Sequence, residues 1–498
     1  MKILAKLEKS REIWFLIVAS LIFFFLRFPS LFEPDWYGDE GIYQTLGIGI
    51  KAGRLLYRDV FDNKPPLLYL FYSFVSSDQF MIKLLSLIFG LLSVIVFFYL
   101  CKRLFENIKA SFVATSVFAI LFGLPLIEGN IANAENFMLL LNISAGYLII
   151  RSLNLNLKSE IINHKSLIIF IAGLLLGISF LFKIVAIFDF AAFAAFLFFA
   201  NYSKRILDIC SIKNLTKEVK SLTPFIIGFV IPIAITIIYF LFNHAFKEFL
   251  TATLFSNVGY VEYGNKFIIP QGFLIFKLMF LGSFSLFIFW KRKTYGLPFA
   301  FVSLWLGFSL FNAYFSQRPY THYVLILLPA FCLTIGLFVL NKNFSKLAGV
   351  LMLSAFIAVL LNFNFYTKTI FYYQNFAAFI LNRQSVSSYQ SFFDKSTPRD
   401  YEIANFINLN TKASDNIFIW GNNAQVYKLT NKLPPGKYAA AYHITSYKDG
   451  DSNTKTGLET NKPKFIIVIP NVPIFPFSLA GYDSKISIAG VDIYEKLY

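Results

Sequence analysis

Long apolar runs separated by short polar connections fill the first three quarters of the chain. The first run reads IWFLIVASLIFFFLRF, and similar runs recur to about residue 366. An apolar helix of about 20 residues is long enough to cross a bilayer. The pattern predicts about eleven spans, at residues 12–28, 80–101, 110–127, 136–150, 166–182, 184–200, 222–243, 272–290, 296–312, 322–340 and 347–366. The first run lacks a small-residue cleavage site, so we expect a retained helix rather than a signal peptide.

Two segments can each be assigned to the membrane in more than one way. The stretch 65–78, PPLLYLFYSFVSSD, is too short to cross comfortably and is typical of an interfacial or re-entrant piece. Lys183 interrupts FLFKIVAIF, so this region is either a hairpin between two spans or a single span that inverts everything after it. The basic connections later in the chain favour the hairpin.

The pattern changes after about residue 385. TPRDYEIANFINLN predicts a helix with Thr397 as its N-cap, Pro398 at the first helical position and Asp400 in the first turn. NIFIW and KFIIVIP read as buried strands. We therefore expect a transmembrane domain over residues 1–375, with a first outer loop at 29–79, and a small α/β domain over 385–498.

Composition and charge agree with a membrane protein. The chain is 57% hydrophobic and 15% charged, which is too apolar for an ordinary soluble protein. The net charge of +17 does not indicate nucleic acid, because the basic residues cluster in alternate connections between spans. Those connections, at 2–11, 102–109, 151–165, 204–220, 291–293 and 342–346, predict a cytoplasmic N-terminus. The loops 29–79, 128–135, 244–271 and 313–321 and the C-terminal domain are then extracytoplasmic. Cys101, Cys210 and Cys332 are far apart in sequence, and we expect no disulfide between them.

The first outer loop contains the carboxylates that most need an explanation. Asp39 and Glu40 directly follow Trp36, Tyr37 and Gly38 near the end of the first span. Adjacent carboxylates on a loop are usually only solvated, but an aromatic frame beside the membrane favours a functional role. One of the two can take a proton from an attacking group. The other can bind a cation or orient the first.

The same loop contains basic residues suited to a lipid phosphate. Ile42, Leu46 and Ile50 form an apolar stripe followed by Lys51, Arg54 and Arg58, as in a helix lying in the membrane interface. In DNKPP, the two prolines stiffen the chain and move Lys64 away from helical geometry. A lysine fixed in this way can bind a phosphate, although a lysine at a span boundary can also simply reach for the interface.

Two later outer segments add polar candidates. LIEGNIANAENF contains Glu128 and Glu135 with asparagines between them, a group suited to binding hydroxyls or a cation, or else a short polar turn. In SQRPYTHYVLILLP, Arg318 can clamp phosphate oxygens, and His322 can bind a metal or a phosphate or be structural. The chain has no Gly-rich nucleotide loop, so an energy-coupled pump is unsupported.

With these residues, the chain resembles polytopic glycosyltransferases of the C-type fold, of the protein O-mannosyltransferase and aminoarabinose-transferase superfamily. The resemblance rests on DEGIYQTLGIGIKAGRLLYRDVFDNKPPLLYL, EGNIANAENF and RPYTHYVLILLP, and covers roughly the first 340 residues. It implies an α-helical polytopic protein with about 11–13 transmembrane helices and a small α/β extracytoplasmic domain. It also implies a polyprenyl-phosphate-linked sugar as donor and a hydroxyl of a protein, lipid or glycan as acceptor.

The resemblance implies a role for each candidate. Asp39, as the catalytic base, and Glu40 are the expected catalytic residues. An acidic metal ligand precedes the lysine in some relatives, whereas Asn63 stands there in this chain and Asp62 one residue earlier. No cofactor is expected with certainty, and a divalent metal is left open. Donor phosphate is expected at Lys64, Arg58, Arg318 and Tyr323, acceptor or sugar at Tyr43, Asn133 and Glu135, and a metal, if any, at Asp62, Glu128 and His322.

Two other readings remain. A lipid-linked saccharide transporter would favour several charged residues inside the spans, where Lys183 and Asp189 are the main exceptions in this chain. A membrane anchor with inert outer loops would tolerate the loss of Asp39. We favour an inverting transferase in the cell membrane.

Overall fold

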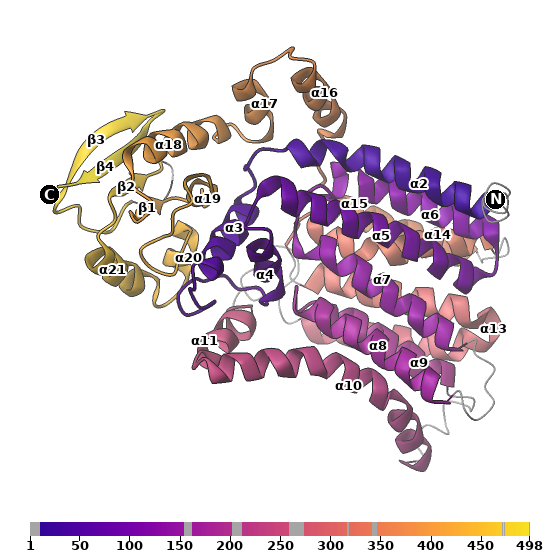
Figure 1. Ribbon diagram of the computed structural model, residues 1–498. Coiled ribbons are helices and arrows are strands. Elements are labelled where there is room, and N and C mark those ends of the chain that lie inside the picture. The colour runs from indigo at the N-terminus through magenta and orange to yellow at the C-terminus, as the bar shows by residue number, and fades with distance from the viewer. Residues whose placement is uncertain are drawn as a thin grey trace, which may run out of the picture. The chain divides into compact units, whose positions relative to one another are not determined.

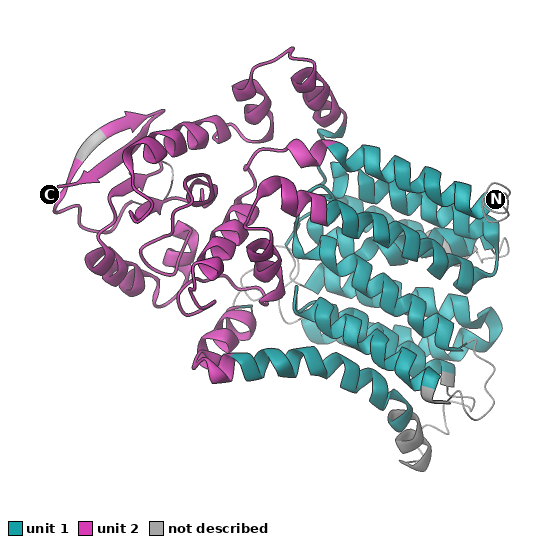
Figure 2. Cartoon of the chain, in the orientation of Figure 1, with its two compact units in different colours: residues 1–28, 86–239, 257–369 teal, residues 29–85, 240–256, 370–498 magenta. Residues whose placement is uncertain are grey.

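The computed structural model describes residues 10–153, 162–201, 212–257, 273–315, 318–340, 346–470, 472 and 474–497 (Figure 1). These residues form two compact units (Figure 2). The first comprises Met1–Phe28, Ser86–Tyr239 and Asn257–Thr369, and the second comprises Pro29–Leu85, Phe240–Ser256 and Ile370–Tyr498. The predicted division at residues 375–385 stays a prediction. Cys210 and parts of the basic connections (2–9, 158, 204–211 and 342–345) lie outside the described residues.

Unit 1 is a bundle of apolar helices, and each predicted span overlaps a helix, with the spans 272–290 and 296–312 sharing one. Neighbouring helices pack in the pairs α7 with α8, α6 with α14, α13 with α14, α9 with α13 and α2 with α6. Their shared core is rich in phenylalanine, as at Phe97, Phe118 and Phe193. The helices are α2 (Arg11–Arg27), α5 (Gln79–Phe105, which begins in unit 2), α6 (Ile108–Gly123), α7 (Ala134–Leu153), α8 (Ile162–Phe180), α9 (Ala186–Asn201), α10 (Ile212–Phe242), α13 (Phe273–Phe315), α14 (His322–Leu340) and α15 (Lys346–Asn362); a short turn, η2 (Pro125–Ile127), precedes α7.

Among the described residues, 6 helical segments are long and apolar enough to cross a membrane. Shorter apolar helices accompany them, including α6 and α9. The protein is therefore a multi-pass membrane protein with a mainly helical fold, as the sequence predicts. The qualifying segments are Arg11–Phe32, Gln79–Phe105, Ala134–Leu153, Lys220–Phe242, Leu274–Phe315 and His322–Leu340.

Two breaks in the helices have local causes. Helix α13 contains both predicted spans 272–290 and 296–312, and is kinked at Gly296, where φ is 83° and ψ is 176°. This backbone conformation is open to glycine and strained for other residues. At the segment that contains Lys183, α8 ends at Phe180 and α9 begins at Ala186. Residues 182–184 thus lie in a turn between two helices, which is the hairpin alternative.

Unit 2 combines the first loop with the C-terminal residues. Its helices are η1 (Phe28–Phe32), α3 (Gly38–Lys51), α4 (Leu67–Phe74), α11 (Phe246–Leu250), the π-helical turn η5 (Thr251–Phe255), α16 (Thr369–Ile380), α17 (Val386–Phe393), α18 (Thr397–Asn410), α19 (Gln425–Thr430), α20 (Ala441–Ser446) and α21 (Gly450–Asn461). The segment 65–78 contains the short helix α4, which is too short to span a bilayer.

A four-stranded sheet of order β1-β2-β4-β3 forms the core of the C-terminal part. Both predicted strands are present as β1 (Ile417–Trp420) and β2 (Phe465–Val468), which pair in parallel with Ile417 opposite Phe465. A parallel pair requires a long crossover, and here it contains α19, α20 and α21. The strands β3 (Tyr482–Ile488) and β4 (Val491–Lys496) form an antiparallel hairpin that the sequence analysis missed. The predicted N-cap Thr397 is wrong by one residue, because Thr397 is the first residue of α18 and Ser396 precedes it.

Candidate functional site

Asp39 and Glu40 begin helix α3 and have different surroundings. Tyr37 precedes the helix in an extended conformation, so both carboxylates fall in the first turn, where the helix dipole favours negative charge. Consecutive side chains on a helix point about 100° apart. The side chain of Asp39 is 38% exposed and that of Glu40 only 2%. Only Asp39 is accessible to a substrate.

Lys64 lies beside Asp39 and is held through its backbone. Its amide donates to the Tyr69 hydroxyl at 3.1 Å, and its carbonyl accepts from the Tyr57 hydroxyl at 2.7 Å. Its Nζ is 3.8 Å from Asp39 Oδ2. The same Nζ lies 4.8 Å from the centroid of the Tyr43 ring, a cation–π contact. The ammonium group is therefore fixed next to the accessible carboxylate.

Asp62 and Tyr43 complete this group, which we call the Asp39–Lys64 cluster (Asp39, Tyr43, Asp62 and Lys64). The Tyr43 hydroxyl donates to Asp39 Oδ2 at 3.1 Å. Asp62 Oδ2 is 3.6 Å from Lys64 Nζ and accepts from the Tyr69 hydroxyl at 2.8 Å. Burial raises the pKa of Asp62, but the charge of Lys64 and the hydrogen bonds from Tyr69 and the Asn63 amide hold that pKa below its ordinary value. Asp62 is thus an ionised carboxylate at neutral pH.

His443 belongs to the surroundings of this cluster, and the sequence analysis missed it. Its Nε2 lies 3.6 Å from Asp62 Oδ1. Burial is the main cause that lowers the pKa of His443, with Lys64 acting in the same direction and Asp62 and Asp39 opposing. The imidazole is therefore neutral at neutral pH. It comes from α20, about 380 residues after Asp62, and a lone histidine in AAAYHITS gives no local signal of this contact.

The C-terminal part of unit 2 packs directly on α3. The Thr45 hydroxyl donates to the Ala424 carbonyl at 3.1 Å. A Cβ added at Gly41 would lie 2.5 Å from the backbone nitrogen of Gln425. Helices α3 and α19 can therefore approach this closely only because residue 41 is glycine. The C-terminal segment therefore helps to fix the helix that carries Asp39.

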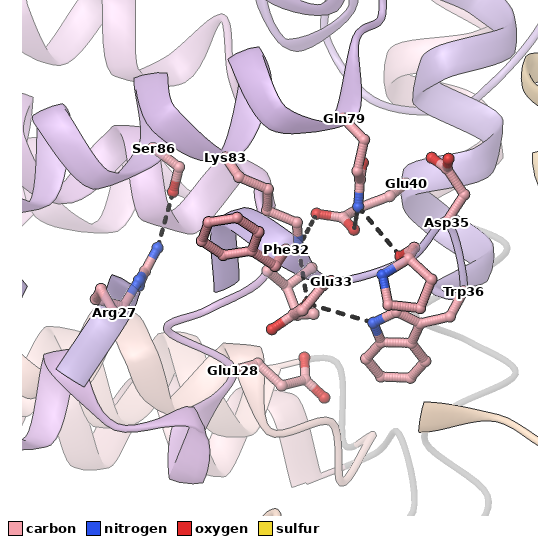
Figure 3. A network of polar contacts seen from close by, with 12 residues as sticks. Arg27, Phe32, Glu33, Asp35, Trp36, Glu40, Gln79, Lys83, Ser86 and Glu128 are labelled. Atoms are coloured by element: carbon pink, nitrogen blue, oxygen red, sulfur yellow. Dashed lines mark hydrogen bonds and ion pairs between the residues drawn. The ribbon is translucent and has the colours of Figure 1, made fainter. Parts of the chain in front are cut away.

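Glu40 contributes to a separate network, formed with Glu33 and Lys83 (Figure 3). Lys83 Nζ lies 2.8 Å from Glu40 Oε1 and 3.2 Å from Glu33 Oε2, and all three side chains are buried. Glu33 also accepts from the Tyr372 hydroxyl at 2.7 Å and from Trp36 Nε1 at 3.3 Å. Glu40 is thus held in a buried ion pair at the start of α3, whereas Asp39 is accessible.

Unit 1 contains a second polar group. Glu128 Oε2 is 3.0 Å from His322 Nδ1, and Glu128 has a positive φ of 56°, a strained conformation for a non-glycine residue. Glu135 forms an ion pair with Lys183, whose Nζ lies 4.4 Å from the centroid of the Tyr323 ring. Glu128 and His322 thus form one pair, while Glu135 and Tyr323 both contact Lys183. The His322 and Tyr323 rings, 4.7 Å apart, connect the two groups.

The remaining predicted residues have different surroundings. Asn133 is buried, and within the described residues neither its amide nitrogen nor its oxygen has a hydrogen-bond partner. Arg58 is exposed and pairs with Asp59, with Nε 3.0 Å from Oδ1. Arg318 Nη1 lies 3.5 Å from the Tyr320 hydroxyl. The contacts of Arg58 do not join it to the Asp39–Lys64 cluster.

The three candidate metal ligands do not form a metal site in the part of the chain that the structure describes. There, no group of three or more histidine, cysteine, aspartate or glutamate side chains could hold an ion. Glu128 and His322 form only a pair, and Asp62 has the Lys64 ammonium beside it. Catalytic zinc sites use three protein ligands. The candidate residues that the structure describes therefore do not form a three-ligand metal site, and we assign no step to a metal.

Comparison with known proteins shows which solved structures share this fold. No family model matches the chain, and no curated protein sequence matches it. Solved structures do match. ArnT from Cupriavidus metallidurans bound to undecaprenyl phosphate is 12% identical, with a TM-score of 0.54 and 97% of each chain covered. The archaeal oligosaccharyltransferase AglB from Archaeoglobus fulgidus, in complex with an inhibitory peptide and a dolichol-phosphate, is 15% identical, with a TM-score of 0.50, 93% of this chain and 70% of AglB covered.

Sequence identities of 12% and 15% show a similarity of fold and nothing more about function. The apo form of ArnT matches over the same shares of both chains, with a TM-score of 0.51. The match extends through the helical bundle and the C-terminal residues. The chain therefore has the C-type glycosyltransferase (GT-C) fold.

Proposed function

We propose that this protein is an inverting glycosyltransferase that moves a sugar from a polyprenyl-phosphate-linked donor to an acceptor hydroxyl. The observation that carries the proposal is an accessible carboxylate, Asp39, fixed 3.8 Å from the ammonium of Lys64. This pairing supplies a base for an acceptor and a cation for a phosphate leaving group. The fold adds support, because ArnT was solved with undecaprenyl phosphate and AglB with a dolichol-phosphate.

The reaction is a single displacement. The acceptor oxygen attacks the anomeric carbon of the sugar, and its proton passes to the Asp39 carboxylate. The bond between that carbon and the phosphate oxygen breaks, and the electron pair leaves with the polyprenyl phosphate. Lys64 stabilises the charge that develops on the leaving phosphate. One displacement inverts the anomeric configuration without a covalent enzyme intermediate.

Lys64 is the proposed centre of donor binding, with Arg58, Arg318 and Tyr323 as further phosphate contacts. We expect Lys64→Ala to raise the Kd for undecaprenyl phosphate by about tenfold or more, because a charge-assisted phosphate contact is lost. Binding to the purified full-length protein in nanodiscs measures the effect. Lys455→Ala, at an exposed lysine of α21, is the control and should leave the Kd unchanged. Equal affinities of the Lys64 variant and the wild type would contradict this role.

Asn133 and Glu135 are proposed to bind hydroxyls of the sugar or acceptor, together with Tyr43. The support is the buried Asn133 amide, which lacks a partner among the described residues; such a group usually has a reason to persist. We expect Asn133→Ala to lower transfer about tenfold while the Kd for undecaprenyl phosphate and the thermal stability stay unchanged. Removing an amide without partners breaks no hydrogen bond within the described protein. A matched loss of stability and activity would show that Asn133 is structural.

The proposed location of the reaction is the extracytoplasmic side of the cell membrane, with the N-terminus in the cytoplasm. The support is the charge of the connections between spans. In intact cells we expect a membrane-impermeant maleimide to label Lys455→Cys in the C-terminal domain. The wild-type protein is the control, since it contains the same three native cysteines, Cys101, Cys210 and Cys332, without the introduced one. Labelling only after the cells are lysed would invert this topology.

A further inference from the structure

His443 is a buried histidine surrounded by aromatic rings. It projects from α20, and its side chain is 3% exposed. The rings of Tyr442, Tyr447 and Phe61 lie at centroid distances of 4.2, 5.7 and 5.8 Å. Such packing restricts the imidazole to one orientation. The ring nitrogens of His443 therefore have fixed positions, and can fix the position of a side chain that they contact.

The polar atoms of His443 are not explained by packing. Nδ1 is buried and has no hydrogen-bond partner among the described residues. Leaving a buried polar atom without a partner costs stability, so an apolar side chain would fill this position more favourably. Nε2 lies 3.6 Å from Asp62 Oδ1, too far for a hydrogen bond but close enough for an electrostatic contact with an ionised carboxylate. The polar function of this side chain is therefore directed at Asp62.

Asp62 connects His443 to Lys64 through its two oxygens. Oδ1 faces His443 at 3.6 Å, while Oδ2 faces Lys64 Nζ at 3.6 Å. A carboxylate that lost its contact with His443 would interact more strongly with Lys64. The ammonium would then be drawn from its position near Asp39 toward a closed ion pair with Asp62, and its charge would be less available to a phosphate.

Other contacts hold the C-terminal segment against the loop independently of His443. The Phe61 amide donates to the Lys437 carbonyl at 3.0 Å. Arg54 Nη1 donates to the Pro434 carbonyl at 2.9 Å. Substitution of His443 therefore leaves this attachment in place, and its effect on Asp62 can be measured separately.

We propose that His443 is a positioning residue for donor binding, which holds the Asp62 carboxylate so that Lys64 remains available to the donor phosphate. The C-terminal domain is then part of the donor site rather than an appended module. This inference rests on the proposed function, in which Lys64 binds the phosphate of a polyprenyl-phosphate donor.

The test is a double-mutant cycle on the Kd for undecaprenyl phosphate, measured with full-length protein in nanodiscs. We expect His443→Phe, which keeps the aromatic packing, to raise the Kd about tenfold. His443→Gln, whose amide can still donate toward Asp62, should stay within about threefold of wild type. In a Lys64→Ala background, His443→Phe should have little further effect, because both changes act on the same contact. Thr445→Ala is the control on α20, since among the described residues the Thr445 hydroxyl donates to carbonyls of its own helix.

The outcomes separate this inference from the proposed function. Failure of the wild-type protein to bind undecaprenyl phosphate overturns both. If the wild type binds and Lys64→Ala weakens binding, a normal Kd for His443→Phe overturns the inference alone. Additive effects of the two substitutions also overturn it, as they would mean that His443 acts independently of Lys64. If His443→Phe does not fold, Asp62→Asn is measured instead. It removes the carboxylate that competes for Lys64 at 3.6 Å, so the Kd should stay equal or fall, and a rise in Kd overturns the inference.

Discussion

Replacing Asp39 with asparagine is expected to reduce sugar transfer by about 10²–10⁴-fold, because an amide cannot accept the proton of the acceptor hydroxyl. Binding of the donor should survive. The substitution removes a negative charge 3.8 Å from the Lys64 ammonium, so the affinity for an anionic phosphate should stay equal or increase. Loss of turnover with retained binding is a signature that general unfolding would not produce.

The measurement pairs two assays on the purified variant. Transfer is followed by mass spectrometry of the glycosylated product, and binding is followed with undecaprenyl phosphate. Asp451→Asn, at an exposed acid of α21, is the control and should match the wild type in both. An Asp39→Asn protein that retains most of its transfer activity would remove Asp39 from the role of base.

Replacing Lys83 with methionine is expected to lower the free energy of unfolding by about 3–5 kcal/mol, the cost of breaking a buried ion pair on one side. Lys83 is the cation between two buried carboxylates, at 2.8 Å from Glu40 and 3.2 Å from Glu33. Without it, two buried negative charges face each other next to the start of α3. We therefore expect a lower thermal unfolding temperature and, through the displaced helix, lower transfer activity.

Two variants make this prediction specific. Lys102 lies on α5, like Lys83, and forms an exposed ion pair with Glu12 of α2. Lys102→Met removes this cation and should change stability by less than about 1 kcal/mol. The combination of Lys83→Met with Glu33→Gln and Glu40→Gln leaves no unpaired charge and should recover much of the lost stability. A Lys83→Met protein as stable as Lys102→Met would show that the network does not anchor α3.

The sequence predicts the helical bundle well because its signal is local. An apolar run of about 20 residues is sufficient to indicate a span, so each predicted range overlaps a helix, although 272–290 and 296–312 lie in the single helix α13. The same reasoning found β1 and β2 from continuous apolar runs. It missed the β3–β4 hairpin, in which YDSKISI and VDIYEK contain charged residues that weaken the apolar pattern.

The site could be predicted only in part, because the contact between His443 and Asp62 joins residues far apart in sequence. DNKPP identifies Lys64 locally, and the neighbouring Asp39 lies 25 positions earlier. Nothing local in the chain indicates that His443 meets Asp62, since that contact depends on how the C-terminal segment folds onto the first loop. Lys83 did leave a signal: it interrupts the apolar run QFMIKLLSL, and a charged residue in a span indicates a buried partner.

The exposure of adjacent residues also could not be read from the sequence. Asp39 and Glu40 look equivalent in the string DWYGDEGIY. The structure gives them different surroundings because the chain enters α3 at Tyr37, which leaves Asp39 exposed and places Glu40 in the Glu33–Lys83 network. A prediction that this segment is helical does not show which carboxylate is exposed unless the first residue of the helix is also known.

Mass spectrometry of lipid-linked sugars is the most direct test of the central claim, that the Asp39–Lys64 cluster uses a polyprenyl-phosphate-linked donor. Cells whose only copy carries Asp39→Asn are compared with cells that carry the wild-type protein. Our account predicts that one polyprenyl-phosphate-linked sugar accumulates in the variant while a sugar of the same mass disappears from surface glycans. Identical pools of lipid-linked sugars and identical surface glycans in the two strains would contradict it.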